Sequence, residues 1–278
     1  MRKNKKFSKN IFIIMNNEME NNIQKKDNSQ YFSDCTYYAL PPYNRGSKIW
    51  ILIAFNKSLF KTLLCCISII KNENKETILT ILDYLSLKYN FNPNIITLDF
   101  GRGPYVAFKT KFPNCRIFPC FFHFIQRILL HLKEINSTNK TLKKKAKDLL
   151  ANIKLLCFIN NNEIDSFYDK IYRKYNKTFP KFFKYFNNTY LDKGLFSDRN
   201  WNYYNISSLF NNNDLYFFTN NICESNNRTL NLKYIGVCKS YYGFRNAILE
   251  LINIFKEKKP YEEKYCSITH ALDYYGKN

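Results

Sequence analysis

Three carboxylates lie on predicted elements of regular structure, two of them on strands and one on a helix. Asp34 lies in the aromatic, β-prone run YFSDCTYYAL, and Asp99 closes the strand pattern NIITLDF. Glu224 is the single acid in the amide-rich run TNNICESNNRTL, for which we expect a helix. Carboxylate oxygens suit Mg²⁺ or Mn²⁺, and two such ions about 3.5–4 Å apart can promote phosphodiester cleavage. The three acids therefore raise the hypothesis of a two-metal nuclease site.

Glu224 also has a purely structural interpretation. Thr219 and Asn220 are good helix N-caps, and Glu224 precedes Arg228 by four residues. That spacing forms ion pairs on an exposed helix face. From this segment alone, a capped surface helix and a metal ligand both remain open.

The chain carries a strong positive charge. Its 43 Lys and Arg residues against 22 Asp and Glu residues give a formal net charge of +21. A polyanionic partner fits this excess. The abundance of Asn, Ile, Tyr, Phe and Lys together is also what an AT-rich genome imposes, so the charge by itself does not specify nucleic acid.

Cysteine usage and hydropathy suggest a location inside the cell. The nine cysteines are scattered and odd in number, which does not fit a disulfide framework and favours a reducing compartment. The longest apolar runs, 49–55 and 63–70, are too short to span a membrane, so we expect no membrane association. RKNKK near the start is either a nuclear import signal or a solvated charge run.

Hydrophobic patterning predicts an α/β fold. Residues 31–40, 49–55 and 63–70 have the composition of strands, with a hairpin turn at Asn56 to Ser58 joining the last two. Alternating helix and strand patterns follow, at 75–90, 94–100, 103–112, 115–122 and 124–134. Three strands followed by helix, strand, helix and strand is the order of the ribonuclease H-like fold, a mixed sheet flanked by helices.

This order makes the first and fourth strands parallel neighbours. Adjacent strands lie about 5 Å apart, and ligands of α/β sheets gather at the carboxyl ends of strands. We therefore expect Asp34 and Asp99 to meet at one edge of the sheet, with Glu224 completing the cluster from a later helix.

The same patterning divides the chain into segments. We expect a basic flexible tail over 1–30 and the first part of the catalytic core over 31–135. An all-helical insertion over 136–200 has apolar stripes that include Leu142, Leu149 and Ile153. Residues 201–257 then complete the core, and 258–278 form a C-terminal tail.

Four segments resemble the catalytic blocks of Mutator-like element (MULE) transposases. The first block of the family has an Asp followed by Thr, an aromatic and Pro, and the second has a strand ending in Asp-Phe that leads to Cys-Phe-Phe-His. The third segment contains a late Trp. The fourth has Thr-Asn-Asn-x-x-Glu leading to Arg and Leu-Asn. Here they read SDCTYYALPP, IITLDFGRGPYVAFKTKFPNCRIFPCFFHFIQRI, LFSDRNWNYYN and TNNICESNNRTLN. The resemblance runs in order from about residue 31 to 256.

The resemblance implies a DDE transposase with a ribonuclease H-like core. Asp34, Asp99 and Glu224 would hold two Mg²⁺ or Mn²⁺ ions, while His123 and Arg228 would contact the scissile phosphate or steady Glu224. The implied reaction is hydrolysis at element ends, followed by attack of the 3′-hydroxyl on target DNA. Double-stranded DNA is the expected partner, a homodimer on DNA the expected assembly and the nucleus the expected location.

The sequence also departs from the family. The family usually has an acid after Asp-Phe and a Gly after the first Asp, where this chain has Gly101 and Cys35. Full-length relatives often carry zinc-binding DNA-recognition domains, whose spacing is not found here. We therefore expect a fragment, a domesticated copy or a transposase that lost its recognition module. A non-catalytic DNA-binding or interaction protein is the main rival, and a nuclease acting on RNA or hybrid is a third reading.

Three further features allow two interpretations each. Cys120 and His123 form a C-x-x-H pair, but a zinc site needs more ligands, and we favour a structural or active-site-neighbour role. Trp201 either stacks on an unpaired base or ties the insertion to the core. The stretch KTLKKKAKD (140–148) either follows a phosphate backbone or is a solvated helix face.

Overall fold

The computed structural model describes residues 5–8, 11–36, 47–191, 194–197, 199–204 and 241–257. The chain divides into two compact units. The first contains the described residues up to Ile117 together with the late helix α9 (Tyr241–Glu257), and the second contains those from Phe118 to Tyr204. We describe each unit separately.

The first unit is built on a seven-stranded mixed sheet, and the chain has the α/β architecture that the sequence predicted. The strand order is β1-β2-β5-β4-β3-β6-β7. The strands are β1 (Lys5–Ser8), β2 (Ile11–Ile14), β3 (Asn28–Thr36), β4 (Lys48–Asn56), β5 (Lys61–Ile70), β6 (Ile95–Leu98) and β7 (Arg116–Pro119).

The centre of the sheet is the antiparallel hairpin of β4 and β5. Nearly every residue of both strands is buried, because their apolar runs face packed layers on both sides. The turn is held by Asn56, whose Oδ1 accepts a hydrogen bond from the Leu59 N–H at 3.0 Å, and by Phe60 at a positive φ of 49°. The predicted hairpin is confirmed, although the turn extends beyond Ser58 to Phe60.

β3 pairs antiparallel with β4 and parallel with β6, as the sequence predicted for the first and fourth strands. The parallel register places Tyr31 opposite Ile96 and Ser33 opposite Leu98. Between these strands the Gln30 amide donates to the Thr97 hydroxyl at 2.8 Å, and both side chains are buried. A register slip would break this buried polar contact, so it helps to fix the pairing.

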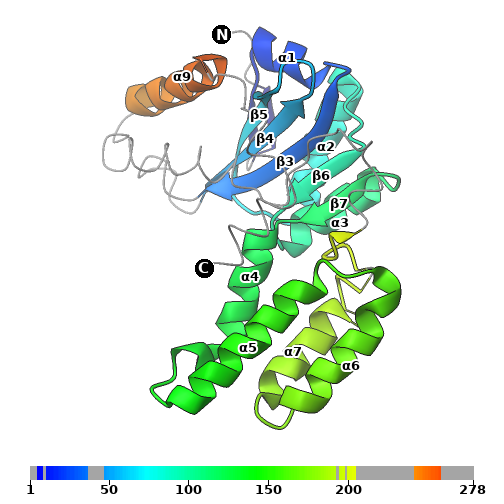
Figure 1. Ribbon diagram of the computed structural model, residues 1–278. Helices are drawn as coiled ribbons and strands as arrows, with labels where there is room; N and C mark the ends of the chain where they lie inside the picture. The colour runs from blue at the N-terminus through cyan, green and yellow to red at the C-terminus, as the bar shows by residue number, and fades with distance from the viewer. Residues whose placement is uncertain are drawn as a thin grey trace. The chain divides into compact units, whose positions relative to one another are not determined.

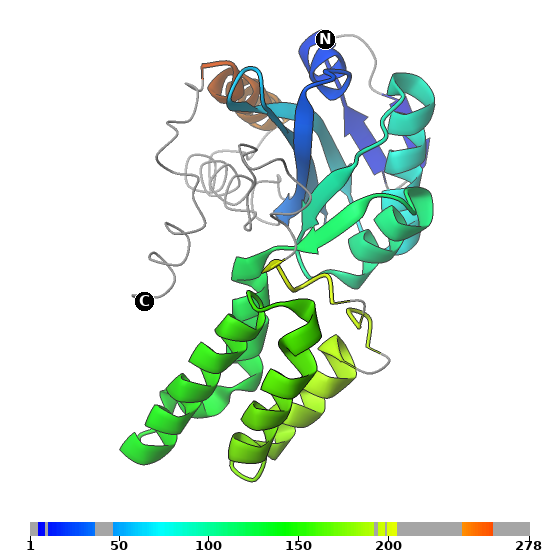
Figure 2. The same ribbon diagram turned by 45° about the vertical axis from the view of Figure 1, so that its right-hand side comes forward.

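Helices α2 (Lys75–Tyr89) and α3 (Arg102–Lys111) contact each other on one face of the sheet, and α9 lies on the other side against β5 (Figures 1 and 2). α2 begins where the Asn74 side chain accepts from the Thr77 N–H at 2.9 Å. It ends at Asn90, whose φ of 53° is a left-handed cap. The helices predicted at 75–90 and 103–112 are therefore present.

The strand predicted over 115–122 is shorter than expected. β7 ends at Pro119, and the helix α4 (Phe121–His131) begins directly after Cys120. Phe121 and Phe124 continue the apolar pattern but belong to the buried stripe of the helix. These aromatic residues have a high β propensity, but packing of the helix determines their conformation.

The expectation of a flexible tail over 1–30 is wrong for most of that segment. Ile11–Ile14 forms β2, which pairs antiparallel with the second half of β5. The helix α1 (Asn17–Ile23) follows, capped where Asn16 accepts from the Met19 N–H at 2.8 Å. The few apolar residues of this segment are enough to bury it, because β5 offers an unpaired edge.

The second half of this N-terminal segment packs against an irregularity in β5. The register of β4 against β5 shifts between Leu52 and Ile53, which leaves Cys65 as an extra residue. Asn22 of α1 donates from its side chain to the Leu64 carbonyl at 3.0 Å. The helix therefore satisfies a backbone group of β5 beyond the end of β2.

The second unit is helical, as predicted for the insertion, but starts at Phe118 rather than at 136. Its helices are α4, α5 (Lys140–Leu156), α6 (Ile164–Tyr175) and α7 (Pro180–Tyr190), with short 3-10 turns η2 (Lys133–Asn136) and η3 (Asn161–Glu163). Their buried faces are strongly aromatic, as the ring stacking of Tyr168 on Phe186 illustrates. No helix in the described ranges is both long and apolar enough to cross a membrane.

Trp201 packs inside this helical unit. Its side chain is fully buried, stacks on Phe124 and donates from Nε1 to the Tyr190 carbonyl at 3.1 Å. Of the two interpretations left open by the sequence, burial supports a packing residue, although the partners described for Trp201 belong to the helical unit and not to the core. A side chain with no exposed surface cannot stack on a base without local unfolding.

Replacing Ile13 by Asn should lower the free energy of unfolding by about 3 kcal/mol, because Ile13 is 2% exposed and lies on a paired strand. Urea denaturation followed by far-ultraviolet circular dichroism measures this. Lys26→Asn changes an exposed residue of the same segment and should leave the midpoint unchanged. Equal midpoints for both variants would mean that residues 11–30 do not contribute to the fold.

Candidate active site

Asp34 and Asp99 lie at the same edge of the sheet. The last paired residues of β3 and β6 are Ser33 and Leu98, and each aspartate follows one residue further along its strand. The strands are parallel, so both acids stand at the carboxyl ends. The meeting predicted from the strand order is thereby supported for two of the three acids.

Backbone amides orient both carboxylates. Asp34 is 7% exposed, and its Oδ1 accepts from the Cys35 N–H at 2.8 Å. Asp99 is less buried, and its Oδ1 accepts from the Gly101 N–H at 3.3 Å. A Cβ at position 101 would lie 3.1 Å from that oxygen, so glycine lets the chain turn close to the carboxylate.

The pKa of the Cys35 thiol is raised by its surroundings. Burial raises its pKa well above the usual range, and the negative charges of Glu73, Asp99 and Asp34 raise it further. The thiol also hydrogen-bonds to Glu73, which favours the protonated form. Cys35 therefore stays a neutral thiol at physiological pH, hydrogen-bonded to Glu73.

Glu73 is a residue of this edge that the sequence analysis did not single out. It follows β5 and precedes α2, and Lys48 at the start of β4 pairs with it at 2.9 Å. Both side chains of this pair are about 15% exposed (16% and 15%). Lys48 thus supplies a positive charge next to an edge that collects negative ones, which lowers their mutual repulsion.

The loop that carries Glu73 also abuts the start of α3. A Cβ at Gly103 would lie 2.0 Å from the Glu73 carbonyl oxygen, so only glycine allows this approach. The segments after β5 and β6 are therefore packed together at the edge that carries Asp99. In the sequence, Glu73 stands in the polar run KNENKE, where an acid is usually solvated, and only the strand order could have indicated its position.

The remaining predicted site residues fall elsewhere. Glu224 and Arg228 lie outside the described residues. His123 lies in the first turn of α4, in the helical unit, and burial together with the nearby Arg127 lowers its pKa, so its imidazole is neutral at pH 7. Cys120, its partner in the C-x-x-H pair, is fully buried before the same helix.

Within the described ranges, no group of three or more His, Cys, Asp or Glu side chains is arranged to hold a metal ion. Of the three expected ligands, Asp34 and Asp99 stand at neighbouring strand ends, whereas Glu224 lies outside the described residues. No protein-family model and no curated protein matches this chain.

A double-mutant cycle with Lys48→Met and Glu73→Gln should give a coupling energy of about 1 kcal/mol, because the two side chains form a partly buried ion pair. Urea denaturation of the wild type, both single variants and the double variant measures it. The exposed pair Arg199 and Asp165 (31% and 73% exposed) provides the comparison and should couple less. Coupling near zero for Lys48 and Glu73 would contradict their role in holding this edge.

Proposed function

We propose that this chain is the catalytic domain of a metal-dependent DNA-processing enzyme similar to MULE transposases. The observation that carries the proposal is the parallel register of β3 and β6, which brings Asp34 and Asp99 to neighbouring carboxyl ends. Catalytic acids of α/β enzymes gather at such edges. The order β5-β4-β3-β6-β7 supports the finer assignment of a ribonuclease H-like fold.

The acids of this edge suit a hard divalent cation. Asp34 and Asp99 offer carboxylate oxygens, which are preferred by Mg²⁺ and Mn²⁺. In this proposal Glu224 is the third ligand. Two bound ions would activate the attacking oxygen and stabilise the leaving oxygen of a phosphodiester.

Residues of the chain would position the reacting groups. Hydrogen bonds from the Cys35 and Gly101 amides hold Asp34 and Asp99 in place without a large rearrangement. His123, neutral at pH 7, and Arg228 are proposed to contact the scissile phosphate or to steady Glu224. Double-stranded DNA is the proposed substrate, a homodimer the proposed assembly and the nucleus the proposed location.

A non-catalytic DNA-binding protein is the second candidate, and α5 would supply its binding surface. The lysines of its first three turns are exposed and form a basic surface: Lys140, Lys143, Lys144, Lys145 and Lys147. Such a surface binds phosphates without regard to sequence. Binding through α5 would serve a catalytic and a non-catalytic protein equally, so only cleavage separates the two.

With Mg²⁺ present, the full chain should nick a supercoiled plasmid, and Asp99→Asn should lower the nicking rate about 100-fold or more, since it removes a ligand charge from the reacting centre. Agarose gel electrophoresis of the plasmid measures the rate. Asp34→Asn and Glu224→Gln should have comparable effects.

Glu76→Gln is the matched control, since it neutralises an exposed acid in the first turn of α2 and should retain full activity. Cleavage of an RNA–DNA hybrid in preference to duplex DNA would indicate the ribonuclease alternative. Plasmid binding without metal-dependent nicking would favour the non-catalytic candidate.

A further inference from the structure

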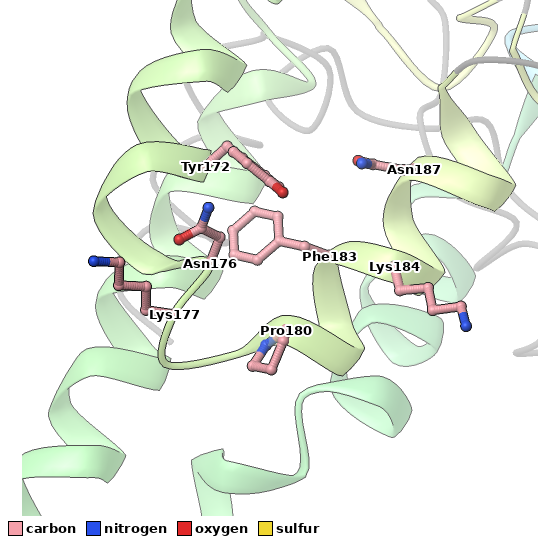
Figure 3. Close-up of a pocket in the computed structure, with 7 residues that line it drawn as sticks. All are labelled: Tyr172, Asn176, Lys177, Pro180, Phe183, Lys184 and Asn187. Atoms are coloured by element: carbon pink, nitrogen blue, oxygen red, sulfur yellow. The ribbon is translucent and has the colours of Figure 1, made fainter.

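The helical unit contains a pocket that is separate from the acids discussed above. It has a volume of about 350 Å³ and lies between α6 and α7, where the two helices meet at their connecting turn (Figure 3). That volume is within the range of small-ligand sites. The lining residues are Tyr172, Asn176, Lys177, Pro180, Phe183, Lys184 and Asn187.

Two aromatic rings form the apolar part of the pocket. Phe183 projects into the hollow and is 2% exposed, whereas Tyr172 is 38% exposed above it. Their rings meet edge to face, with centroids 5.2 Å apart and an interplanar angle of 83°. Tyr172 therefore keeps ring surface open to solvent, where a planar group can stack on it.

Two amides supply the polar part of the pocket. The Asn187 Oδ1 accepts a hydrogen bond from the Tyr168 hydroxyl, so the Asn187 amide nitrogen is oriented to donate elsewhere. Asn176 lies across the hollow from Asn187, at the end of α6. Paired amides beside an exposed ring are suited to the hydrogen-bonding edge of a nucleobase.

The charged groups of the pocket are all positive. Lys177 and Lys184 are exposed and flank the hollow on opposite sides, with their ammonium groups pointing outward (Figure 3). None of the described residues that line the pocket is an acid. This arrangement complements a ligand whose centre is planar and whose negative charges lie on either side of it.

We propose that this pocket binds one nucleotide of a single-stranded nucleic acid. The base would stack on Tyr172 with its edge toward Asn176 and Asn187, and the phosphates before and after it would contact Lys177 and Lys184. A strand fits better than a free nucleotide, because the two lysines stand on opposite sides of the base. The pocket does not rest on the proposed catalysis, since none of its residues belongs to that site.

Fluorescence anisotropy of the full chain with a labelled twelve-residue oligodeoxythymidine tests the base contact. Tyr172→Ala should weaken binding about tenfold, as expected for the loss of one stacked base. An abasic strand of the same length should bind the wild type and Tyr172→Ala equally well. Tyr172→Phe keeps the ring and should bind like the wild type, which separates lost stacking from lost folding.

Neutralising the two lysines tests their contacts with phosphate. Lys177→Gln with Lys184→Gln should weaken the binding of both strands and reduce the steepness of log affinity against log salt by about 1.4, which is the loss expected for two phosphate contacts on a single strand. Lys26→Gln with Lys170→Gln removes two exposed lysines outside both the pocket and α5, and should lower affinity less. Thymidine monophosphate and inorganic phosphate distinguish a free nucleotide from a strand.

Three outcomes would overturn the proposal. The first is that Tyr172→Ala weakens binding of the thymidine strand and of the abasic strand equally, which would show that Tyr172 does not contact a base. The second is equal weakening by the two lysine pairs, which would leave only general charge attraction. The third is competition by thymidine monophosphate at the concentrations at which the strand binds, which would assign the pocket to a free nucleotide.

Discussion

The parallel pairing of β3 with β6 is the constraint on which the rest of the first unit depends. A parallel neighbour requires a crossover, which α2 provides on one face of the sheet, and it directs both strands toward the same edge. A slip of one residue would turn Asp34 to the opposite face from Asp99. The buried hydrogen bond from Gln30 to Thr97 opposes such a slip, because breaking it would leave polar groups unpaired in a place without water.

Charge is the second constraint at this edge. The negative charges of Glu73, Asp99 and Asp34 all raise the pKa of the Cys35 thiol, beyond the effect of its burial. Lys48 offsets the charge of Glu73 through an ion pair at 2.9 Å. Asp34 and Asp99 stand at neighbouring strand ends of the same edge. The edge is therefore organised in two parts, an ion pair on the side of β4 and β5 and two aspartates on the side of β6.

Sequence patterning predicted the elements whose signals are local and strong. The apolar hairpin of β4 and β5, the helix α2 and the strand before Asp99 all carry such signals. The failures have tertiary causes. β2 was missed because Ile11–Ile14 is short and stabilised by the edge of β5. Glu73 was missed because its place depends on strand order and on the close approach allowed by Gly103. Trp201 could not be placed because exposure is a property of the packed helices.

The proposed catalysis depends on a cation shared by two aspartates that stand 65 positions apart in the sequence. Soaking crystals of the full chain in Mn²⁺ and collecting anomalous scattering data locates any bound ion directly. We predict Mn²⁺ ligated by Asp34 and Asp99, with the anomalous peak lost in Asp99→Asn. Crystals in which both carboxylates are open to solvent and no Mn²⁺ lies between them would contradict it.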